Sequence, residues 1–521
     1  MDTDVIVVGA GATGLMVATE LALAGVRPLV LESRTDRAAE SRALNLHPRT
    51  AEILDCRGLL EPLLKHRISL GTPAHSFFGA LPVPLDCHPW GTRHPYQIGV
   101  VQSRVEEYLE RRLTELGGTV SRGREVTGVT QDADGVTATV SAAGRERPVR
   151  ARWLVGCDGG RSATRKALGL AFPGTDGTQI FVAADVVLAR PPEEWHAELA
   201  PDRRRNLRLL PGNSLAGVVP VAGGRLMFSL RALEDGVHRL SFSGPDVQRV
   251  PRSEPVTDTE IRAAVRAACG LDVELKEIRW ASRFSDACRQ VERYRTGRVL
   301  LAGDAAHIIV PLGGQGLNLG LQDGFNLGWK LAATVHGRAP DELLDSYHDE
   351  RHPAAALLLR DARAQFTLLD GGPELGQLRE VLTELLALPD TNRHLAGVVS
   401  GLGLRHPVPD GEHPLVGRRL PDPDLRTAAG TVRCHTLLRS GRGVLLDLGG
   451  DGADAAASAE TAAVAGRWAD RVDHHRATVV AGPVAGPDAR RLLVRPDGHV
   501  CWADDPRRLA DALTRWFGAP R

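Results

Sequence analysis

The sequence predicts an α/β fold in which a parallel sheet is assembled from two separated parts of the chain, with a mostly β insertion between them and a small α/β domain at the carboxyl end. Three glycine-rich stretches, each following a short apolar run, indicate this fold: residues 9–14, 156–165 and 303–316. Apolar runs that lead through glycine into a helix are typical of buried parallel strands. A chain of 521 residues exceeds one ordinary domain, so we expect roughly two to four.

The amino-terminal stretch matches a dinucleotide-binding unit of Rossmann-like βαβ form. A strand at Asp4 to Val8 enters the turn Gly9-Ala10-Gly11-Ala12-Thr13-Gly14, a helix follows over 15–24, and a second strand over 29–31 ends at Glu32. In such a turn the first glycine permits the tight bend, the second lets the backbone approach a pyrophosphate, and the third lets helix and strand pack closely. The acid can bind an adenosine ribose hydroxyl. We therefore expect this unit to bind a dinucleotide.

The third glycine-rich stretch predicts the other half of the site. Val299 to Ala302 has the pattern of a buried strand, and Asp304 lies just beyond its carboxyl end. Open α/β sheets bind ligands at that edge, where a carboxylate can accept hydrogen bonds from hydroxyl groups. After Pro311, the run 313–316 opens a helix that we predict over 317 to about 335. The start of such a helix stabilises negative charge, for example on a reduced flavin ring.

Between these motifs, a loop and a helix are expected close to the nucleotide. The polar stretch Ala38 to Arg49 should form a loop over it, from which Arg42 could reach a pyrophosphate or remain solvated. An amphipathic helix predicted over 102–116 begins at Gln102, whose side chain offers both a donor and an acceptor. Its charged residues, Glu106 among them, are expected to point outward.

Strands and a second ligand loop come next, followed by an inserted sheet. The strands are predicted at 124–129, 135–140 and 149–155. The last of them leads into Asp158-Gly159 and a short helix, which has the form of a ligand site. From Gly174 to about Asp272 the pattern changes to strand-like segments without a nucleotide motif. Such a sheet could form a wall over the ligand of the flanking halves, and no catalytic side chain is predicted in it.

The remaining chain divides into helices and a small terminal domain. Residues 341–402 are helical in pattern, and 407–423 is a linker rich in proline, glycine and aspartate. Strands at 443–448, 471–480, 491–494 and 500–502 with helices near 457–468 and 506–517 have a thioredoxin-like order. The predicted domains are 1–175 and 273–402 for the two parts of the dinucleotide-binding domain, 176–272 for the inserted β-sheet and 403–521 for the terminal domain.

Composition narrows the function. The 64 basic and 64 acidic residues cancel, which argues against a nucleic-acid partner and suits an uncharged or amphiphilic small molecule. The amino-terminal residues pass directly into a strand and no apolar run has the length of a membrane span, so we expect a cytoplasmic protein. The seven cysteines form no CxxC pair, which argues against a metal site and dithiol chemistry. Cys434 is expected to have a packing or interface role.

Together the motifs resemble those of the single-component, class A flavoprotein monooxygenases: GAGATG with Glu32, the DG motif at Asp158-Gly159, and Gly303-Asp304 followed by PxGGQGxN. The resemblance implies a glutathione-reductase-type, para-hydroxybenzoate-hydroxylase-like fold with FAD as cofactor and NADPH or NADH as co-substrate. Carried over position by position, it implicates as cofactor-binding residues Gly9, Gly11, Ala12, Thr13, Gly14, Glu32, Ser33, Arg42, Gln102, Asp158, Asp304, Pro311, Gly314, Gly316, Leu317 and Asn318. Ser33 stands where the family often has arginine, which puts an adenosine-side contact in doubt.

Within that family the chain most resembles the aromatic polyketide hydroxylases of antibiotic biosynthesis, with TRHPY at 92–96 and NRHLAG at 392–397 closest to those acting on tetracycline-type or angucycline-type polyphenols. The resemblance implies hydroxylation of a polycyclic phenol by O₂ through a flavin C4a-hydroperoxide, in a monomer or homodimer. No covalent catalytic residue is expected, and His307, a lone histidine beside a buried strand, should be structural. The alternatives are inactivation of a rifamycin-type antibiotic, Baeyer–Villiger oxidation, a flavin-dependent halogenase and a non-enzymatic flavin-binding protein.

Overall fold

A parallel sheet lies at the centre of the computed structural model, which describes residues 1–37, 41–70, 76–79, 81–210, 214–409, 411–449, 455–482 and 489–520. Its main strands follow the order β20-β21-β11-β1-β2-β8. Strand β1 (Thr3–Val8) pairs in parallel with β11 (Arg145–Gly156) and β2 (Pro28–Glu32), and β11 pairs in parallel with β21 (Val299–Leu301). In this register Val8 lies opposite Gly156, and Gly156 opposite Leu301. The three predicted loops therefore leave the same edge of the sheet.

Helix α1 (Ala12–Leu23) packs unusually closely against α10 (Gln315–Val335), and this contact joins the two halves of the domain. The contact face of α10 carries glycine at every fourth position. A Cβ on Gly320 would lie 2.3 Å from the Thr13 hydroxyl, and one on Gly328 would lie 2.3 Å from Cβ of Glu20. These distances are far below van der Waals contact, so only glycine permits this separation of the helices. The first motif is thereby fixed against the start of α10.

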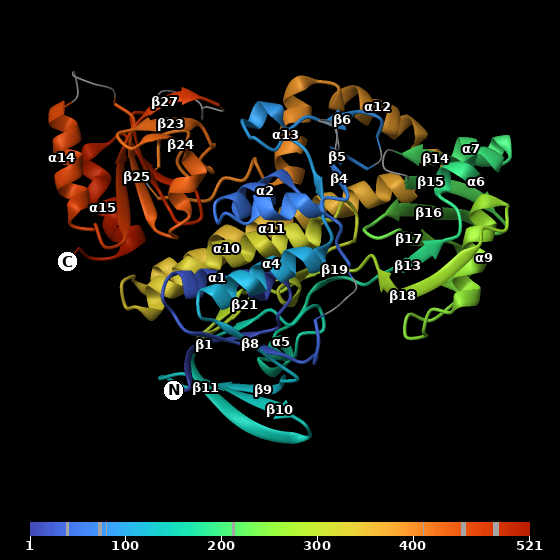
Figure 1. Ribbon diagram of the computed structural model, residues 1–521, viewed down its shortest axis with the longest axis horizontal. Helices are drawn as coiled ribbons and strands as arrows, with labels where there is room; N and C mark the ends of the chain where they lie inside the picture. The colour runs from blue at the N-terminus through green and yellow to red at the C-terminus, as the bar shows by residue number, and fades with distance from the viewer. Residues whose placement is uncertain are drawn as a thin grey trace.

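The inserted sheet is antiparallel, with the strand order β14-β15-β16-β17-β13-β18. It forms the right-hand end of the molecule, where α9 (Asp258–Cys269) covers its outer side (Figure 1). Its strands are β13 (Ile180–Leu188), β14 (Leu207–Leu210), β15 (Ser214–Val221), β16 (Gly224–Ala232), β17 (Val237–Ser243) and β18 (Leu275–Ser285). Strand β18 pairs with β13 along most of its length. The sheet thus extends to Ser285, beyond the edge near residue 272 that the sequence pattern suggested.

The terminal domain has the predicted thioredoxin-like order and lies at the left in Figure 1. A mixed sheet β26-β25-β28-β29 is flanked by helices α14 and α15. The elements are β25 (Gly443–Asp447), α14 (Ala455–Gly466), β26 (Val472–Arg476), β28 (Arg491–Val494), β29 (Val500–Ala503) and α15 (Pro506–Phe517). The single strand expected over 471–480 is wrong, because β27 (Thr478–Ala481) leaves β26 and pairs with β23 (Asp424–Thr427) in a separate sheet with β24 (Gly430–Arg433).

Long helices and short strands complete the chain. The helical region is α11 (Asp341–Asp370), α12 (Gly376–Leu386) and α13 (Pro389–Ser400). The predicted hairpin is β9 (Glu125–Gln131) with β10 (Val136–Ala142). The other elements are β3 (Asn45–Leu46), α2 (Pro48–Asp55), α3 (Leu60–Leu63), β4 (Ser69–Leu70), β5 (Ser76–Phe77), β6 (Pro84–Leu85), β7 (Ile98–Gly99), α4 (Gln102–Glu115), β8 (Thr119–Arg122), α5 (Ala163–Ala167), β12 (Gly174–Thr175), α6 (Pro192–Glu198), α7 (Pro201–Asn206), α8 (Pro245–Gln248), β19 (Cys288–Gln290), β20 (Arg295–Thr296) and β22 (His307–Ile308). The predicted fold class is confirmed.

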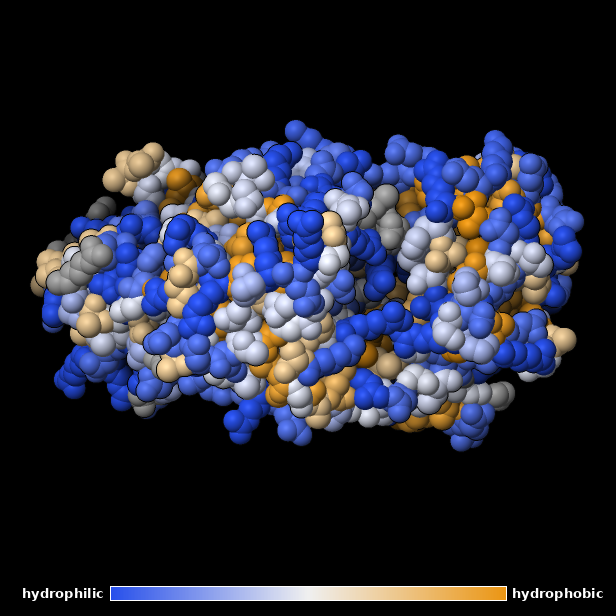
Figure 2. Space-filling model, turned by 90° about the horizontal axis from the view of Figure 1, so that it is seen from below, coloured by the Kyte–Doolittle hydropathy of each residue, from blue (hydrophilic) through white to orange (hydrophobic). Residues whose placement is uncertain are grey.

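The surface seen from below is mostly hydrophilic, with hydrophobic side chains in scattered patches and a recess between the middle of the molecule and the end that carries the inserted sheet (Figure 2). Among the described residues, no helix combines the length and apolar character needed to cross a membrane.

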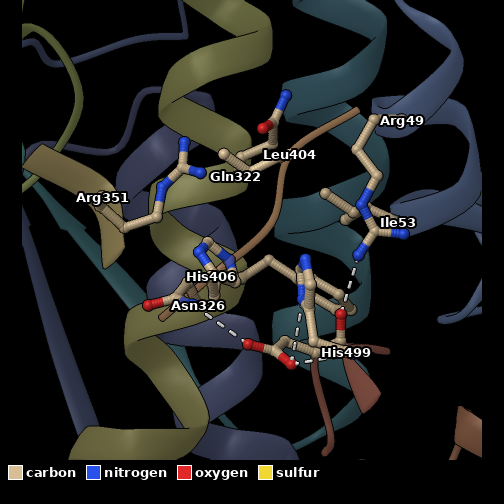
Figure 3. A pocket seen from close by; sticks show the side chains of 10 residues that line it. Arg49, Ile53, Gln322, Asn326, Arg351, Leu404, His406 and His499 are labelled. Atoms are coloured by element: carbon tan, nitrogen blue, oxygen red, sulfur yellow. Dashed lines mark hydrogen bonds and ion pairs between the residues drawn. The ribbon is translucent and has the colours of Figure 1, made fainter. Parts of the chain in front are cut away.

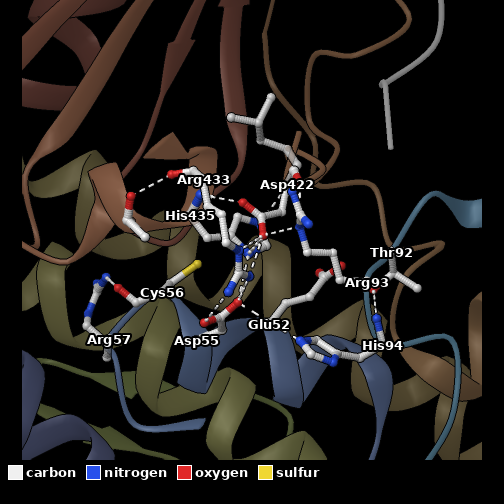
Figure 4. A network of polar contacts seen from close by, with 12 residues as sticks. Glu52, Asp55, Cys56, Arg57, Thr92, Arg93, His94, Asp422, Arg433 and His435 are labelled. Atoms are coloured by element: carbon white, nitrogen blue, oxygen red, sulfur yellow. Dashed lines mark hydrogen bonds and ion pairs between the residues drawn. The ribbon is translucent and has the colours of Figure 1, made fainter. Parts of the chain in front are cut away.

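Buried ion pairs fasten the terminal domain to α2 and the loop before β7 (Figure 4). Arg57, which is paired with Glu20, donates to the carbonyls of Leu438 and Pro496 in the terminal domain at 2.7 and 3.0 Å. Arg433 donates to the carboxylates of Asp55 and Asp422. His435 is buried beside them, 4.0 Å from both carboxylates. Asp55, Asp422 and His435 converge like metal ligands, but the Arg433 guanidinium already bonds both carboxylates. The cluster is therefore accounted for as an ion-pair network.

The loop TRHPY belongs to this junction as well. Arg93 Nη2 donates to Asp424 at 2.5 Å and its Nε donates to the carbonyl of Asp422 at 2.8 Å. His94 is mostly buried and lies 4.0 Å from Asp55. The stretch that resembles tetracycline-type hydroxylases therefore fastens two domains together in this structure.

We predict that the junction weakens at alkaline pH. Burial alone would lower the pKa of His435, but the Cys56 sulfur and the carboxylates of Asp422 and Glu52 raise it to about 9. Because the folded pKa lies above the unfolded value, this stabilisation is complete below about pH 6.5 and is lost as pH rises through about 9, amounting to at most ~3 kcal/mol. Urea unfolding from pH 6 to 10 should show this loss in the wild type but not in His435→Gln. Identical slopes for both proteins would contradict it.

Candidate functional site

The three predicted loops meet at the carboxyl ends of β1, β11 and β21. A Cβ on Gly9 would lie 2.5 Å from the carbonyl oxygen of Cys157, which shows how closely the first turn lies on the DG loop. A Cβ on Gly303 would lie 2.6 Å from the Thr13 hydroxyl, so the Asp304 loop abuts the same turn. Motifs separated by up to about three hundred residues thus form one continuous backbone surface.

The acid that ends β2 is held by backbone donors of its own loop. Glu32 Oε2 accepts the N–H of Ala10 at 2.8 Å, and Oε1 accepts the N–H of Arg34 at 2.9 Å. The hydroxyl of Ser33 donates to the same carboxylate at 3.3 Å. Glu32 and Ser33 are thus fixed beside the first turn.

Space remains in front of Gly11, the N-cap of α1. The nearest atom to a Cβ built there is Glu106 Oε1 at 3.9 Å, whereas a Cβ on Gly14 would lie 2.0 Å from the carbonyl oxygen of Gly9. Gly14 is therefore required by the packing of the protein itself. Gly11 is not, so its lack of a side chain matters to whatever lies against the turn.

Glu106 is a site residue that the sequence pattern placed wrongly. It is buried, 7% exposed, and its carboxylate accepts the N–H of Ala12 at 3.2 Å and a hydrogen bond from Gln102 Nε2 at 2.7 Å. Burial raises the pKa of its carboxyl, although these two hydrogen bonds lower it. Gln102 Oε1 accepts the N–H of Ala43 at 3.2 Å, which ties α4 to the nucleotide loop. The spacing of four residues from Gln102 was the signal that both face the same way.

Asp158 shapes the DG loop through hydrogen bonds within it. Its carboxylate accepts the hydroxyl of Ser162 at 2.5 Å and the N–H and hydroxyl of Thr164 at 2.9 and 3.0 Å. Arg165 donates to the carbonyl of Ala305 at 3.0 Å and so links this loop to the Asp304 loop. The visible role of Asp158 is to order the loop against which the first turn packs.

The carboxylate of Asp304, unlike that of Asp158, has no hydrogen-bond donor from the described residues of its own loop. Its side chain is exposed and, among the described residues, forms no hydrogen bond or ion pair. The surrounding protein nevertheless removes enough water to raise the pKa of its carboxyl, while His307 and Arg42 act to lower it. An exposed carboxylate that is also desolvated lines a concavity. Asp304 is therefore free to accept hydrogen bonds from a ligand.

The start of α10 borders the same concavity. Gly314 is its N-cap in the left-handed conformation, where a Cβ would lie 2.1 Å from Asn45 Oδ1. Asn318 is buried and donates to the carbonyls of Asn45 and Gly314 at 3.1 and 2.8 Å, so it positions the loop. A Cβ on Gly316 would lie 3.9 Å from Asp304 Oδ1.

The other predicted positions fall around this helix start and the nucleotide loop. Pro311 and Arg42 are exposed, and Leu317 is half-buried against the core. Residues 38–40 of the predicted nucleotide loop lie outside the described residues.

His307 is part of a fully buried ion-pair chain. Its Nε2 lies 2.6 Å from Asp323 Oδ2, and Arg351 Nε lies 2.8 Å from Asp323 Oδ1. Asp323 Oδ2 also accepts the N–H of Gly303 at 3.2 Å. The chain holds the Asp304 loop to α10 and α11, which gives His307 a structural role. Asp323 and Arg351 carried no sequence signal, because each is a lone charge within a helix.

A separate small cavity lies between α2, α10, α11 and the terminal domain (Figure 3). Its lining is mixed, with Ile53, Phe325 and Leu404 beside polar groups such as His406 and His499, and Asp497 accepts from Asn326 at 3.1 Å. None of the predicted cofactor residues lines it. It belongs to the domain junction, where buried polar groups of this kind commonly hold water.

Comparison with known proteins agrees with this geometry. A family model described as "FAD binding domain" matches residues 2–362, and one described as "Aromatic-ring hydroxylase, C-terminal" matches residues 413–520. The 12-dehydrotetracycline 5-monooxygenase/anhydrotetracycline 6-monooxygenase of Streptomyces rimosus subsp. rimosus is 46% identical and covers 100% of both chains. A rifampicin monooxygenase of Streptomyces venezuelae is 42% identical and covers 99% of both.

Among solved structures, the OxyS anhydrotetracycline hydroxylase from Streptomyces rimosus aligns over 100% of both chains with a TM-score of 0.87 and 45% identity. The sequence and structural matches extend over the inserted sheet and the terminal domain as well as the nucleotide-binding unit. The chain therefore belongs to the FAD-dependent aromatic-ring hydroxylase family of monooxygenases.

Proposed function

We propose that FAD lies along the edge where the three loops meet, with its pyrophosphate at Gly11 and the amino-terminal end of α1, and its ribityl chain at Asp304. Two observations support this fit: the open space in front of Gly11, and the unpartnered Asp304 carboxylate. The N-cap residues of α1 and α10 make no side-chain hydrogen bond to the helix. The N–H of Ala12 donates to Glu106, and the amides that follow it in α1, like those at the start of α10, can stabilise negative charge. The bound flavin supplies transfer of electrons from NADPH or NADH to O₂.

The reaction we propose is hydroxylation of a polycyclic aromatic polyketide in antibiotic biosynthesis. The observation that carries it is the face of the inserted sheet opposite α9, from which Arg239 donates to the carbonyls of Ser41 and Arg42 in the predicted nucleotide loop. The chain's own part is to hold a planar substrate between this face and the flavin and to exclude water from the space between them. The relatives named for tetracycline precursors favour this substrate class.

Two other oxidations rest on the same fold. A rifampicin monooxygenase is also a close relative, so inactivation of a rifamycin-type antibiotic is the second candidate. Baeyer–Villiger insertion would use the same cofactor and the same sheet face. Mass spectrometry of products from anhydrotetracycline, an angucycline-type polyphenol and rifampicin, each with NADPH, separates these functions.

We predict that Gly11→Val yields a folded protein that has lost FAD. The new side chain meets no protein atom at its Cβ closer than 3.9 Å, so it occupies the space assigned to the pyrophosphate. Flavin absorbance per protein should fall to near zero while the far-ultraviolet circular dichroism stays unchanged. Gly14→Val is the contrasting variant, because its Cβ would lie 2.0 Å from the Gly9 carbonyl oxygen and should disrupt the fold. A Gly11→Val protein that keeps stoichiometric FAD would refute the assignment.

Asp304→Ala should weaken FAD binding without weakening the apoprotein. Loss of charge-assisted hydrogen bonds of about 1.5–3 kcal/mol each predicts at least a roughly tenfold rise in the Kd for FAD. Because the folded pKa of this carboxyl is raised, its ionised form opposes folding at neutral pH, so unfolding of the apoprotein should need no less urea. Asp158→Ala, which removes an acceptor of several loop hydrogen bonds, should lower stability instead. Unchanged affinity in Asp304→Ala would mean that this carboxylate does not bind FAD.

Reduction should be gated by the aromatic substrate, because the chain has one dinucleotide unit and no second to hold NADPH permanently. Without substrate, NADPH oxidation should be slow and yield hydrogen peroxide. With the right polyphenol it should accelerate and give a hydroxylated product with one atom of ¹⁸O from ¹⁸O₂. Label derived from water, or fast reduction without an aromatic ligand, would rule out the monooxygenase reaction or its gating.

A further inference from the structure

The two faces of the inserted sheet differ in what covers them. The outer face is apolar: side chains such as Val182, Phe228 and Leu240 are buried against Ile261 and Val265 of α9. The opposite face carries small or polar residues, with Ala183 beside Ser241 and Ser241 beside Ser229 on neighbouring strands. Since residues paired across strands share a face, these three form a continuous floor. We call it the inner face.

One end of the inner face approaches the loop after Asp304, and the other end contacts the loop that carries Arg42. At one end Phe181 and Phe284 stack at 5.5 Å, and Phe366 of α11 meets Phe181 edge-on at 5.9 Å. Phe366 and Leu312, which lies in the loop after Asp304, pack against the same buried cluster. At the other end Arg239 donates to the carbonyls of Ser41 and Arg42. The inner face and the flavin site therefore border one space, which agrees with the recess in Figure 2.

Arg231 lies on the inner face, directly opposite Arg239 on the next strand. Its side chain is exposed, yet the surrounding protein removes enough water to lower the pKa of the guanidinium, and no neighbouring charge in the described part of the chain contributes to this shift. Asp304 likewise combines an exposed side chain with a pKa shifted by desolvation, so we place both residues on the lining of a concavity.

The nearby carboxylates already have partners, so Arg231 has no counter-ion. Asp185 pairs with Arg239 at 2.6 Å, and Glu234 pairs with Arg104 at 3.0 Å. Arg231 forms no hydrogen bond or ion pair within the part of the chain that the structure describes. A desolvated cation without a partner disfavours the folded protein, unless a ligand supplies the missing negative charge.

We propose that Arg231 binds an anionic oxygen of the substrate, an ionised phenol or an enolised 1,3-dicarbonyl, and so sets the direction in which the ring system enters. This inference rests on the proposed hydroxylase function, and it specifies in addition that the substrate binds as an anion. Arg231 is four residues along the strands from the Phe181 row, a distance of about 13 Å. Between them Ala183, Ser229 and Ser241 leave room for a planar polycycle. One end of the polycycle then meets aromatic rings and the other end meets a cation.

The test compares Arg231→Met and Arg231→Lys with the wild-type holoenzyme. Kd for a hydroxylated substrate is measured from the change in flavin absorbance, and KM values for that substrate and for NADPH from steady-state rates. We expect Arg231→Met to raise Kd and KM for the phenol at least roughly tenfold, with partial recovery in Arg231→Lys. FAD content and KM for NADPH should not change, and the melting temperature of the ligand-free protein should not fall, because the substitution removes an unpaired desolvated charge. Arg279→Met on β18, which removes an exposed arginine paired with Glu277, is the matched control and should behave as wild type.

A ligand methylated at the acidic hydroxyl separates charge from shape. It should bind wild type and Arg231→Met equally, and wild-type affinity for the free phenol should rise with pH as that phenol ionises. Unchanged Kd in Arg231→Met, or a flat pH profile in the wild type, would overturn the proposal. So would a rise confined to KM for NADPH, which would assign Arg231 to a phosphate of the co-substrate. A wild type that oxidises no polyphenol would instead refute the proposed function.

Discussion

The close contact between α1 and α10 is the constraint on which the rest of the structure depends. Glycine at Gly320, Gly324 and Gly328 brings the two helix axes together, with Thr13, Met16 and Glu20 filling the space that side chains would need. Both helices start at the loops assigned to the cofactor. The distance between α1 and α10 therefore sets how far apart the two helix N-termini of the proposed FAD site lie. A larger residue at any of these glycines would move one half of that site away from the other.

Charge is distributed in two different ways in this molecule. At the domain junction buried ions are paired: Glu350 meets Lys330 at 2.8 Å and Arg495 at 2.6 Å, and Arg495 meets Asp497 at 2.6 Å. Such networks add little net stability over apolar packing, but removing one partner is strongly destabilising, so they specify one docking geometry. At the proposed flavin site Asp304, and on the inner face Arg231, have no partner among the residues that the structure describes. Unpaired, desolvated charges disfavour folding, and they are typical of binding sites in which a ligand supplies the missing hydrogen bond or counter-charge.

The sequence predicted the parts of the site whose function depends on the backbone. The turn at 9–14 and the loops at Asp158 and Asp304 were found because glycine spacing and strand ends are local patterns. Glu106 was misplaced as an outward charge, since its burial depends on α1 arriving over α4 from a distant part of the chain. Strand β18 fell beyond the expected edge of the inserted sheet for a similar reason: its pairing partner β13 lies about ninety residues earlier.

By itself the sequence determined the α/β class, the dinucleotide unit, the inserted sheet and the thioredoxin-like order of the terminal domain, because periodicity and turn residues act over short distances. Only the tertiary structure decided which charges are paired. Asp158 and Asp304 each follow the end of a parallel strand. The carboxylate of Asp158 accepts hydrogen bonds from its own loop, whereas the carboxylate of Asp304 is exposed. Arg231 and Arg239 lie opposite each other on neighbouring strands, but Asp185 forms its ion pair with Arg239. Pairing depends on distances between side chains remote in sequence, and no local pattern records those distances.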